Sequence, residues 1–501
     1  MRAIVWLALL SLLCLCSISD AEQKIVDDEI VIKNVTVVSP ERSAPLARAV
    51  VVIRDGRIAE VGTDLVAGAH PKQIDGHGGF LIPGLIDSHV HVGNMGPLDD
   101  DAIDAHPELL DAYRAQLPRS YLAFGFTTLV DLDLRPSSLD WFNASPVRPN
   151  LCSCGRGVRI VGGYMALKPP KDAAAANAAN IAYEPNTKDW PTNLDPREYS
   201  SARAVARATD AGAICLKTFI EPGFGGPAHW PTPRPETLAA LHDEAKRHGL
   251  VFVVHANALE SWRAALAAHA DVIAHGLWHW PGNQLDATPP PEVHDAIRVA
   301  ADVHVGVQPT MRCTYGDLSI FDKSLLNDPQ LADALPRSII SYLKSDEGQK
   351  AQLAQTDEYR QAISKLLGND VDPIKAMSVG AQRATATLKM MLAKNVKLLF
   401  GTDTPSNEGI GNPPGLNGRL EINHWVKAGV PLAKILRAAT IDNAAAFGFS
   451  DRGTIEVGKR ADLLLLREDP LQSVAAYDTI DTIFLSGKPL PRASLLPAHQ
   501  H

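Results

Sequence analysis

The sequence has no basic run of the kind that binds nucleic acid. Its 57 aspartates and glutamates outnumber its 48 lysines and arginines, which gives a formal net charge of −9. Because recognition of phosphates needs a clustered positive surface, we expect no nucleic-acid partner. The chain also lacks a G-x-S-x-G nucleophile elbow after a strand and a glycine-rich loop of P-loop or Rossmann spacing. These absences argue against a serine hydrolase and a nucleotide-binding enzyme.

A long apolar run occurs only at the start of the chain. Arg2 precedes the apolar residues 3–16, and a small-residue pattern follows that ends at Ala21. This order predicts a signal peptide over residues 1–21; lipoprotein-type cleavage before a cysteine of the run and an uncleaved anchor are weaker alternatives. No later segment provides about 18 uninterrupted apolar residues. We therefore expect an exported protein, periplasmic or secreted, whose mature form does not associate with a membrane.

Cysteine is scarce, with six residues in the chain, of which four follow the predicted signal peptide. These four are Cys152, Cys154, Cys215 and Cys313. So few cysteines in so long a chain do not make a disulfide scaffold, although an exported protein could pair some of them. The spacing of Cys152 and Cys154 is wrong for a zinc knuckle, and no second pair follows. We interpret the cysteines as structural or incidental.

With 501 residues, of which 46% are hydrophobic, the chain can form one large domain and a smaller one. Short β-branched strands separated by turns occur in residues 22–80 and again in residues 449–490. We expect both segments to build one small β-sandwich domain. Residues 81–448 would form the large domain between them, and residues 491–501 a tail.

The middle of the chain alternates short apolar strands with amphipathic helices, a pattern typical of a parallel sheet built from βα units. Eight strands are predicted, at residues 85–92, 127–133, 158–164, 213–219, 250–257, 271–277, 303–309 and 396–403. Helices fit between them at residues 107–124, 196–211, 235–248 and 259–268, and the long connection 312–395 contains helical patterns at 357–367 and 373–394. The fold class is therefore α/β, and eight such units suggest a (β/α)8 TIM barrel with its active site at the carboxyl ends of the strands.

Titratable side chains end several of these strands. His89 and His91 are two residues apart, so in a strand both imidazoles point to one face. Such a pair alone fits core or surface histidines as well as a metal site. However, Lys217, His255, His275 and Asp403 end four other predicted strands. Buried titratable groups are costly unless they are paired or bind metal, so the set favours a metal centre.

These residues stand in motifs that resemble the metal-dependent amidohydrolase superfamily, nearest to its imidazolonepropionase-like and prolidase-like branch. The matching segments are PGLIDSHVH at 83–91, ICLKTF at 214–219, VVHAN at 253–257, AHG at 274–276 and FGTDTP at 400–405. The later segments ATIDNAAAFG at 439–448 and GTIEVGKRADLLLL at 453–466 look like that family's return into the small domain. The resemblance covers nearly the whole mature sequence.

The resemblance implies a centre of two divalent metal ions, for which zinc is the expected identity. His89, His91 and Asp403 would hold the buried ion, and His255 and His275 the more exposed one. Lys217 would bridge both as N6-carboxylysine, because an ammonium group cannot ligate a cation whereas its carbamate can. The catalytic residues would be His275 and Asp403, with Asp403 as the general base and acid. An unmodified Lys217, paired with Glu221 or reaching solvent, would instead leave a mononuclear site.

The resemblance also suggests substrate contacts after the third, sixth and seventh predicted strands. These are Tyr164, Lys168, His279, Arg312 and Tyr315, although each also fits an ordinary loop residue. Asn257 stands where relatives often have another histidine, so contacts borrowed from that position are in doubt. We expect hydrolysis of a C–N amide bond in an N-acyl amino acid or a Xaa-Pro-type dipeptide.

Two alternatives remain open at this point. The first is hydrolysis of a cyclic amide or a lactone, which other branches of the superfamily carry out with a similar set of ligands. The second is a non-catalytic metal-binding barrel, although all six ligand positions are kept. The expected partner is a small-molecule substrate, and assembly into a homo-oligomer is possible because it is common among relatives.

Overall fold

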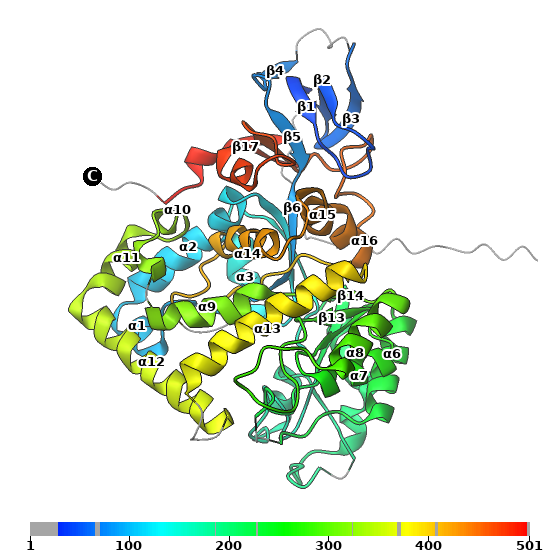
Figure 1. Ribbon diagram of the computed structural model, residues 1–501, viewed down its shortest axis with the longest axis vertical. Coiled ribbons are helices and arrows are strands. Elements are labelled where there is room, and N and C mark those ends of the chain that lie inside the picture. The colour runs from blue at the N-terminus through cyan, green and yellow to red at the C-terminus, as the bar shows by residue number, and fades with distance from the viewer. Residues whose placement is uncertain are drawn as a thin grey trace, which may run out of the picture.

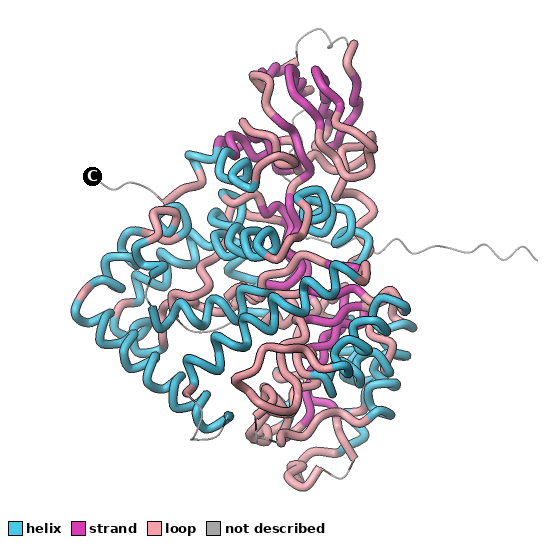
Figure 2. Tube along the Cα trace, in the orientation of Figure 1, coloured by secondary structure: helices cyan, strands magenta, loops and turns pink. Residues whose placement is uncertain are grey.

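A computed structural model of the chain describes residues 29–65, 71–185, 187–226, 229–322, 324–367, 372–405 and 409–497. The predicted signal peptide lies outside the described residues, as does the end of the predicted tail. Figure 1 shows a small β-rich region at the top and a larger region of strands and helices below it. Figure 2 shows strands that continue from one region into the other, with helices on either side.

The upper region is one eight-stranded sheet built from both ends of the chain. Its strands are β1 (Ile30–Val37), β2 (Leu46–Arg54), β3 (Arg57–Gly62), β4 (Lys72–Asp75), β5 (Phe80–Pro83), β16 (Leu463–Leu466), β17 (Ile480–Leu485) and β18 (Lys488–Pro491). The order is β18-β17-β16-β5-β1-β2-β3, with β4 paired to β1. Leu463 of β16 lies opposite Pro83 of β5 in an antiparallel ladder. The two ends therefore meet as predicted, but the sandwich is not confirmed, because the described strands form a single sheet.

The lower region contains two parallel sheets, so the fold is α/β. The first has β6 (Leu85–Val90), β7 (Phe126–Asp131) and β8 (Asn150–Ser153), in that order. The second has β11 (Cys215–Phe219), β12 (Val251–His255), β13 (Val272–Ala274), β14 (Gly306–Gln308) and β15 (Lys397–Leu398). No single continuous ladder closes these sheets into a barrel among the described residues.

The third predicted strand is wrong. Residues 158–164 read as apolar and β-branched, but only Arg159–Ile160 forms a strand there, β9, which pairs with β10 (Ile181–Ala182) in a separate ribbon. The strand that pairs with β7 is β8, whose sequence NLCS is too short and too polar to give a strong strand pattern.

Backbone hydrogen bonds nevertheless connect the two parallel sheets at both edges. The Ile214 amide donates to the Ser153 carbonyl at 2.9 Å, and the Ser88 amide donates to the Phe400 carbonyl at 3.0 Å. Across the interior, the Gln308 amide nitrogen donates to the carbonyl and the hydroxyl of Ser88, both at 2.7 Å. These bonds fix the ends of the strands that carry the predicted site.

Helices follow most of the parallel strands. They are α1 (Asp100–Ala105), α2 (Pro107–Ala123), α3 (Pro136–Ala144), α4 (Ala173–Ala178), α5 (Ser201–Asp210), α6 (Pro235–Arg247), α7 (Leu259–Ala267), α8 (Pro291–Asp302), α14 (Leu416–Lys427), α15 (Leu432–Arg437) and α16 (Asn443–Ala446). Short 3-10 turns are η1 (Pro196–Tyr199), η2 (Ser324–Asn327), η4 (Val474–Thr479) and η5 (Arg492–Ser494), and η3 (Ala438–Asp442) is a π-helical turn. The predicted helices at 107–124, 235–248 and 259–268 are confirmed within a few residues, whereas the predicted helix 196–211 divides into the 3-10 turn η1 and α5.

Helix α6 shows how the sequence sets these elements. Pro235 occupies its first turn, where a missing N–H costs nothing. Leu238, Leu241 and Ala245 repeat at helical spacing and are buried, so one face packs inward. Gly249, with a φ of 67°, then turns the chain toward β12 in a conformation that favours glycine.

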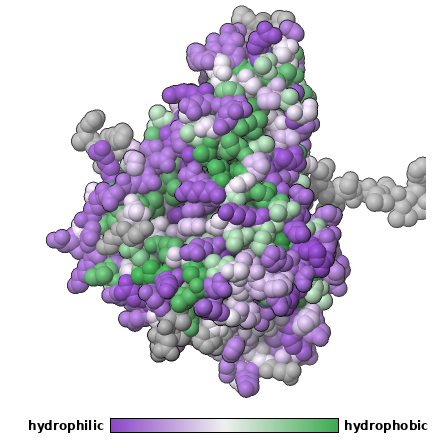
Figure 3. Space-filling model, in the orientation of Figure 1, coloured by the Kyte–Doolittle hydropathy of each residue, from purple (hydrophilic) through white to green (hydrophobic). Residues whose placement is uncertain are grey.

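The long connection between β14 and β15 is helical rather than irregular. It contains α9 (Met311–Asp322), α10 (Leu331–Ala334), α11 (Arg337–Lys344), α12 (Asp346–Leu367) and α13 (Pro373–Ala393). Figure 1 shows these helices together on one side of the larger region. On the face drawn in Figure 3, hydrophobic side chains gather where the β-rich region meets the larger one. Among the described residues, no helix is both long and apolar enough to cross a membrane.

Candidate metal centre

Five of the six predicted ligands lie near or just beyond the carboxyl ends of parallel strands, and Lys217 lies in the middle of β11. His89 is in β6 and Lys217 in β11, His255 is the last residue of β12, and His275 directly follows β13. These four side chains are buried, and Asp403 beyond β15 is buried as well. His91, just past β6, is half-buried. Because parallel strands end on the same edge, residues far apart in sequence are brought together here.

The four histidines form a continuous arc of rings. The centroid distances are 5.3 Å from His91 to His89, 4.9 Å from His89 to His275 and 4.6 Å from His275 to His255. His89 and His91 are thus neighbours at one end of the arc, and His275 and His255 are neighbours at the other.

Asp403 lies at the centre of the arc. Its Oδ1 is 3.2 Å from Nε2 of His89 and 3.0 Å from Nε2 of His91. Its Oδ2 is 3.9 Å from Nδ1 of His275. One carboxylate oxygen therefore faces the first histidine pair and the other faces the second.

The donor set fits a divalent metal ion. His89, His275 and Asp403 each place one ligand atom within 4.8 Å of the others. Both ring nitrogens of His89 are buried and have no hydrogen-bond partner, even though Asp403 is close to Nε2. A buried imidazole without partners is costly, whereas an imidazole lone pair directed at a metal is satisfied. Imidazole and carboxylate are donors that zinc and similar cations accept.

Three non-glycine residues at the site adopt positive φ angles. They are 90° at His275, 42° at Thr310 and 59° at Asp403. Such angles are strained, most of all for a β-branched threonine, and persist where surrounding contacts enforce them. The His275 amide donates to the Gln308 carbonyl at 3.0 Å, and the Asp403 amide donates to the His89 carbonyl at 2.7 Å. These backbone bonds hold the strained turns that direct both side chains toward the centre.

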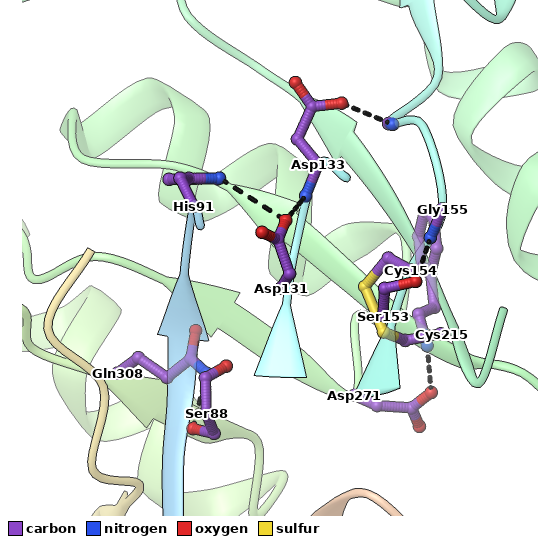
Figure 4. Close-up of a disulfide and its surroundings, with 12 residues drawn as sticks. Ser88, His91, Asp131, Asp133, Ser153, Cys154, Gly155, Cys215, Asp271 and Gln308 are labelled. Carbon is purple, nitrogen blue, oxygen red and sulfur yellow. Dashed lines mark hydrogen bonds and ion pairs between the residues drawn. A yellow bond between two sulfur atoms is a disulfide. The ribbon is translucent and has the colours of Figure 1, made fainter. Parts of the chain in front are cut away.

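Outer residues orient three of the four histidines. Nδ1 of His91 is 3.8 Å from Asp131, as Figure 4 shows, Nε2 of His255 is 3.2 Å from Glu221, and Nδ1 of His275 is 2.9 Å from the Thr310 hydroxyl. A partner on one ring nitrogen fixes the tautomer and leaves the other nitrogen to face a metal.

Sequence reasoning missed two of these outer partners. It passed over Asp131 and Thr310, and it named Glu221 only as a possible partner of Lys217. Asp131 is the last residue of β7 and Thr310 lies just beyond β14, so polar residues at the ends of the remaining strands were the available signal.

Burial lowers the pKa values of three of the four histidines, whereas neighbouring carboxylates raise the pKa of the fourth. Burial lowers the pKa of His89 to about 3 and lowers those of His255 and His275. Burial also opposes the charged form of His91, but Asp131 and Asp403 outweigh it and raise the pKa of that residue to about 10. Three of the four imidazoles are therefore neutral near pH 7, which is the form that binds metal.

The surroundings of Asp403 favour its ionised carboxylate, and the surroundings of Lys217 favour its uncharged amine. Burial alone would raise the pKa of Asp403, but the neighbouring histidines, His89 foremost, hold it well below its usual range. Burial lowers the pKa of Lys217 to about 8, against the pull of Asp403 and Asp133. A larger fraction of the Lys217 amine is thus uncharged near neutral pH than in an exposed lysine.

A disulfide lies beneath Lys217, where the two parallel sheets meet. It joins Cys154, just past β8, to Cys215, the first residue of β11, as Figure 4 shows. Both cysteines are fully buried. Cys215 and Lys217 are two residues apart on one strand, so they point to the same face. The structural reading of these two cysteines is confirmed, and the crosslink restrains the strand that carries Lys217.

A thiol contacts the central carboxylate. Cys313, in the first turn of α9, donates its S–H to Oδ2 of Asp403 at 3.0 Å. From the sequence, Cys313 was interpreted as structural or incidental. Its contact with Asp403 could not be predicted, because the contact depends on α9 following β14 directly.

The predicted substrate-binding residues do not all lie at the metal centre. The Tyr164 ring is 5.1 Å from that of His255, and the His279 ring is 6.2 Å from that of Phe224. Lys168 is exposed on the loop after β9. Tyr164 and His279 therefore border the site.

Arg312 and Tyr315 make contacts within the protein. Nε of Arg312 donates to Asn417 at 2.7 Å, and its Nη2 donates to the Gly411 carbonyl. The Tyr315 hydroxyl is 3.0 Å from that of Thr385. These bonds give both residues a structural role between helices, and their contact with a substrate stays a prediction, as do those of Tyr164, Lys168 and His279.

Comparison with known proteins identifies the family. The model of the Amidohydrolase family matches residues 80–490. The chain belongs to this family, and it is an enzyme that acts on carbon–nitrogen bonds.

Individual relatives are distant. An allantoinase of Deinococcus radiodurans is 23% identical over 475 residues, which cover 91% of this chain and 89% of that protein. A 5-methylthioadenosine/S-adenosylhomocysteine deaminase of Caldanaerobacter subterraneus is 29% identical over 150 residues, 25% of this chain and 35% of that protein, so the match spans about a third of that relative. A solved Xaa-Pro dipeptidase with bound methionine superposes with a TM-score of 0.63 at 20% identity, covering 93% of this chain and all of that one. At this identity the structural similarity shows the fold alone.

Proposed function

We propose that the protein hydrolyses the amide bond of an N-acyl amino acid or a Xaa-Pro-type dipeptide in a metal-dependent reaction. The observation that carries the proposal is Asp403, whose two oxygens face His89 and His91 on one side and His275 on the other. A similar solved structure is a prolidase complexed with N-methylphosphonate-L-proline, which supports the dipeptide class.

The metal centre is proposed to contain two divalent ions, zinc being the expected identity. His89, His91 and Asp403 would hold one ion, and His255 and His275 the other, with Lys217 between them as N6-carboxylysine. The low pKa of the buried Lys217 supports this modification, because only an uncharged amine can add to carbon dioxide. When bound, the ions supply an activated water molecule and polarise the substrate carbonyl.

The chain's own residues position and move the proton. Oδ2 of Asp403 accepts the proton that the attacking water loses and later donates it to the leaving nitrogen. Its Oδ1 lies 3.2 Å from Nε2 of His89 and 3.0 Å from Nε2 of His91, contacts that orient the carboxylate. Glu221 and Thr310 keep His255 and His275 in the tautomers that the centre needs.

The proposal also includes a closed barrel fold and export of the protein. The hydrogen bonds at both edges of the two parallel sheets, and Gln308 across the interior, support a single (β/α)8 barrel. The buried disulfide supports export to an oxidising compartment, periplasmic or extracellular. Beyond the small-molecule substrate and a possible homo-oligomer, no further partner is proposed.

The test is a screen of N-acyl amino acids, Xaa-Pro dipeptides, cyclic amides and lactones with metal-loaded and chelated protein. We expect hydrolysis of members of the first two groups, loss of activity on chelation, and recovery on adding zinc. Activity confined to cyclic amides or lactones would overturn the substrate class. Activity that survives chelation would overturn the metal dependence.

A further inference from the structure

Four aromatic side chains form one cluster beside the metal centre. They are Tyr164 after β9, Phe219 in β11, and Phe224 and Trp230 in the loop after β11, and we refer to them as the aromatic wall. The Tyr164 ring is 5.1 Å and the Phe219 ring 5.9 Å from the ring of His255. The wall therefore borders His255, one of the predicted metal ligands, beside which a substrate would lie to be hydrolysed.

The rings of the wall pack closely against one another. Tyr164 stacks on Trp230 at 5.8 Å with an interplanar angle of 19°, and Phe224 is perpendicular to Trp230 at 5.7 Å. A planar group inserted between two parallel rings needs roughly 7 Å, two van der Waals contacts of about 3.5 Å each. A substrate group must therefore lie against the outer faces of the wall. Tyr164, Phe224 and Trp230 are only half-buried, so part of the wall is exposed to solvent.

One carboxylate connects the wall to the metal centre. Oε1 of Glu221 accepts hydrogen bonds from the Gly223 and Phe224 amides, while its Oε2 lies 3.2 Å from Nε2 of His255. The Trp230 amide donates to the Pro222 carbonyl at 3.0 Å, which closes the loop on itself. The wall is thus held at a fixed place relative to His255 rather than carried on an unsupported loop.

The wall presents an apolar surface. Two cations lie over the Phe219 ring. The Arg159 guanidinium, at 5.1 Å, is paired with Asp133, and the Lys217 amine, at 5.6 Å, is the group that the proposed function converts to a carbamate. Directly after Tyr164, the large apolar side chains of Met165 and Leu167 are each 54% exposed. Exposed apolar side chains beside a binding site favour an apolar ligand.

We infer that the aromatic wall binds an aromatic or bulky apolar side chain of the substrate, next to the amide bond that is cleaved. The inference rests on the proposed function and narrows it to N-acyl amino acids or dipeptides with such a residue. Contacts between aromatic rings contribute to binding affinity through burial of apolar surface and through edge-to-face or stacked interactions. The preference should therefore depend on the shape of the wall and not on any charged group.

The test compares N-acetyl-L-phenylalanine with N-acetyl-L-alanine as substrates of the metal-loaded full chain. We expect kcat/KM to be at least about tenfold higher for the phenylalanine substrate, a ratio in the range that one buried aromatic group gives. In Trp230→Leu and Phe224→Leu the ratio should fall to about threefold or less. Tyr164→Phe should keep the ratio, because the ring and not the hydroxyl makes the contact.

The matched control is Trp190→Leu. Trp190 is also half-buried and also packs edge-on against tyrosines, namely Tyr183 and Tyr199, but it is not part of the wall. This variant should keep the wild-type ratio. A wild-type ratio near one, or a ratio that Trp230→Leu and Phe224→Leu leave unchanged, would overturn the inference.

Binding of the free amino acids separates failure of this inference from failure of the proposed function. L-Phenylalanine and L-alanine are titrated calorimetrically into the metal-loaded wild type. If neither N-acetyl substrate is hydrolysed, the proposed function is wrong for this class, while tighter binding of L-phenylalanine still supports the wall. Equal binding of both amino acids overturns it.

Discussion

In the proposed centre, Lys217 decides whether one metal ion is held or two. Its side chain is buried within electrostatic reach of His89, His255 and His275, whose pKa values its charge lowers. An ammonium group in that position would repel a cation, whereas a carbamate would attract two. The residue therefore has to be modified for the binuclear centre to form.

The first prediction concerns Lys217→Ala. We expect metal analysis to give one equivalent per chain instead of two. We also expect kcat to fall by more than about 100-fold, because loss of a ligand should cost more than the roughly 10- to 100-fold that follows loss of an outer partner. Lys217→Arg, which keeps a positive charge but cannot be carboxylated, should behave like Lys217→Ala. Two equivalents of metal in either variant would contradict the bridging role.

The second prediction concerns the Cys313 thiol that donates to Oδ2 of Asp403. Cys313→Ala removes this hydrogen bond and should lower kcat by about tenfold with KM little changed, since a hydrogen bond to a charged group contributes roughly 1.5 kcal/mol. Cys313→Ser keeps a donor and should stay within about threefold of wild type. If serine and alanine variants have the same kcat, the hydrogen bond does not position Asp403.

At the scale of elements, helix α14 holds the start of α9. Oε1 of Glu421 accepts from the Met311 amide at 2.9 Å and Oε2 accepts from the Arg312 amide at 2.7 Å. The first amides of a helix have no partner within the helix itself, and Glu421 accepts from these two amides of α9. Glu421 thereby also places Cys313 next to the metal centre.

The third prediction is that Glu421→Gln lowers the free energy of unfolding by about 1–3 kcal/mol, because the new amide nitrogen cannot accept from the Arg312 amide. The measurement is chemical denaturation, with Glu236→Gln on the exposed first turn of α6 as a control that should change little. A Glu421→Gln variant as stable as wild type would show that α9 does not depend on this contact.

The disulfide acts at the same scale, since it joins β8 to β11 where the two parallel sheets meet. Our fourth prediction is that the double variant Cys154→Ala/Cys215→Ala loses roughly 2–5 kcal/mol of stability. Reducing agent should destabilise the wild type and leave the variant unaffected. Equal stability of oxidised and reduced wild-type protein would be the opposite result.

At the scale of the whole molecule, the sequence predicted those features whose pattern lies within a single strand or helix. The union of both chain ends in one β-sheet and the helices at 107–124 and 235–248 follow from periodicity and turns. The family's motifs singled out His89, His91 and Asp403, whose side chains the structure brings together, because each motif lies within one strand and the residues just beyond it.

Features that depend on packing between elements could not be predicted. Asp131 and Thr310 support the histidines only because β7 and β14 end beside them. The strand β8 was missed because its four residues carry little apolar pattern, while the more apolar residues after it form only a short ribbon. The contact of Arg312 with Asn417 likewise comes from α14 packing on α9, which no local pattern encodes.

The central claim is that the six converging residues form a metal centre that carries out hydrolysis. The most direct test is to titrate zinc into chelated protein while following hydrolysis of the best N-acyl amino acid or dipeptide. The account predicts no activity without metal, a rise that ends at two equivalents in the wild type, and negligible activity in Asp403→Ala at any zinc concentration. Full activity in the metal-free protein, or in Asp403→Ala, would contradict it.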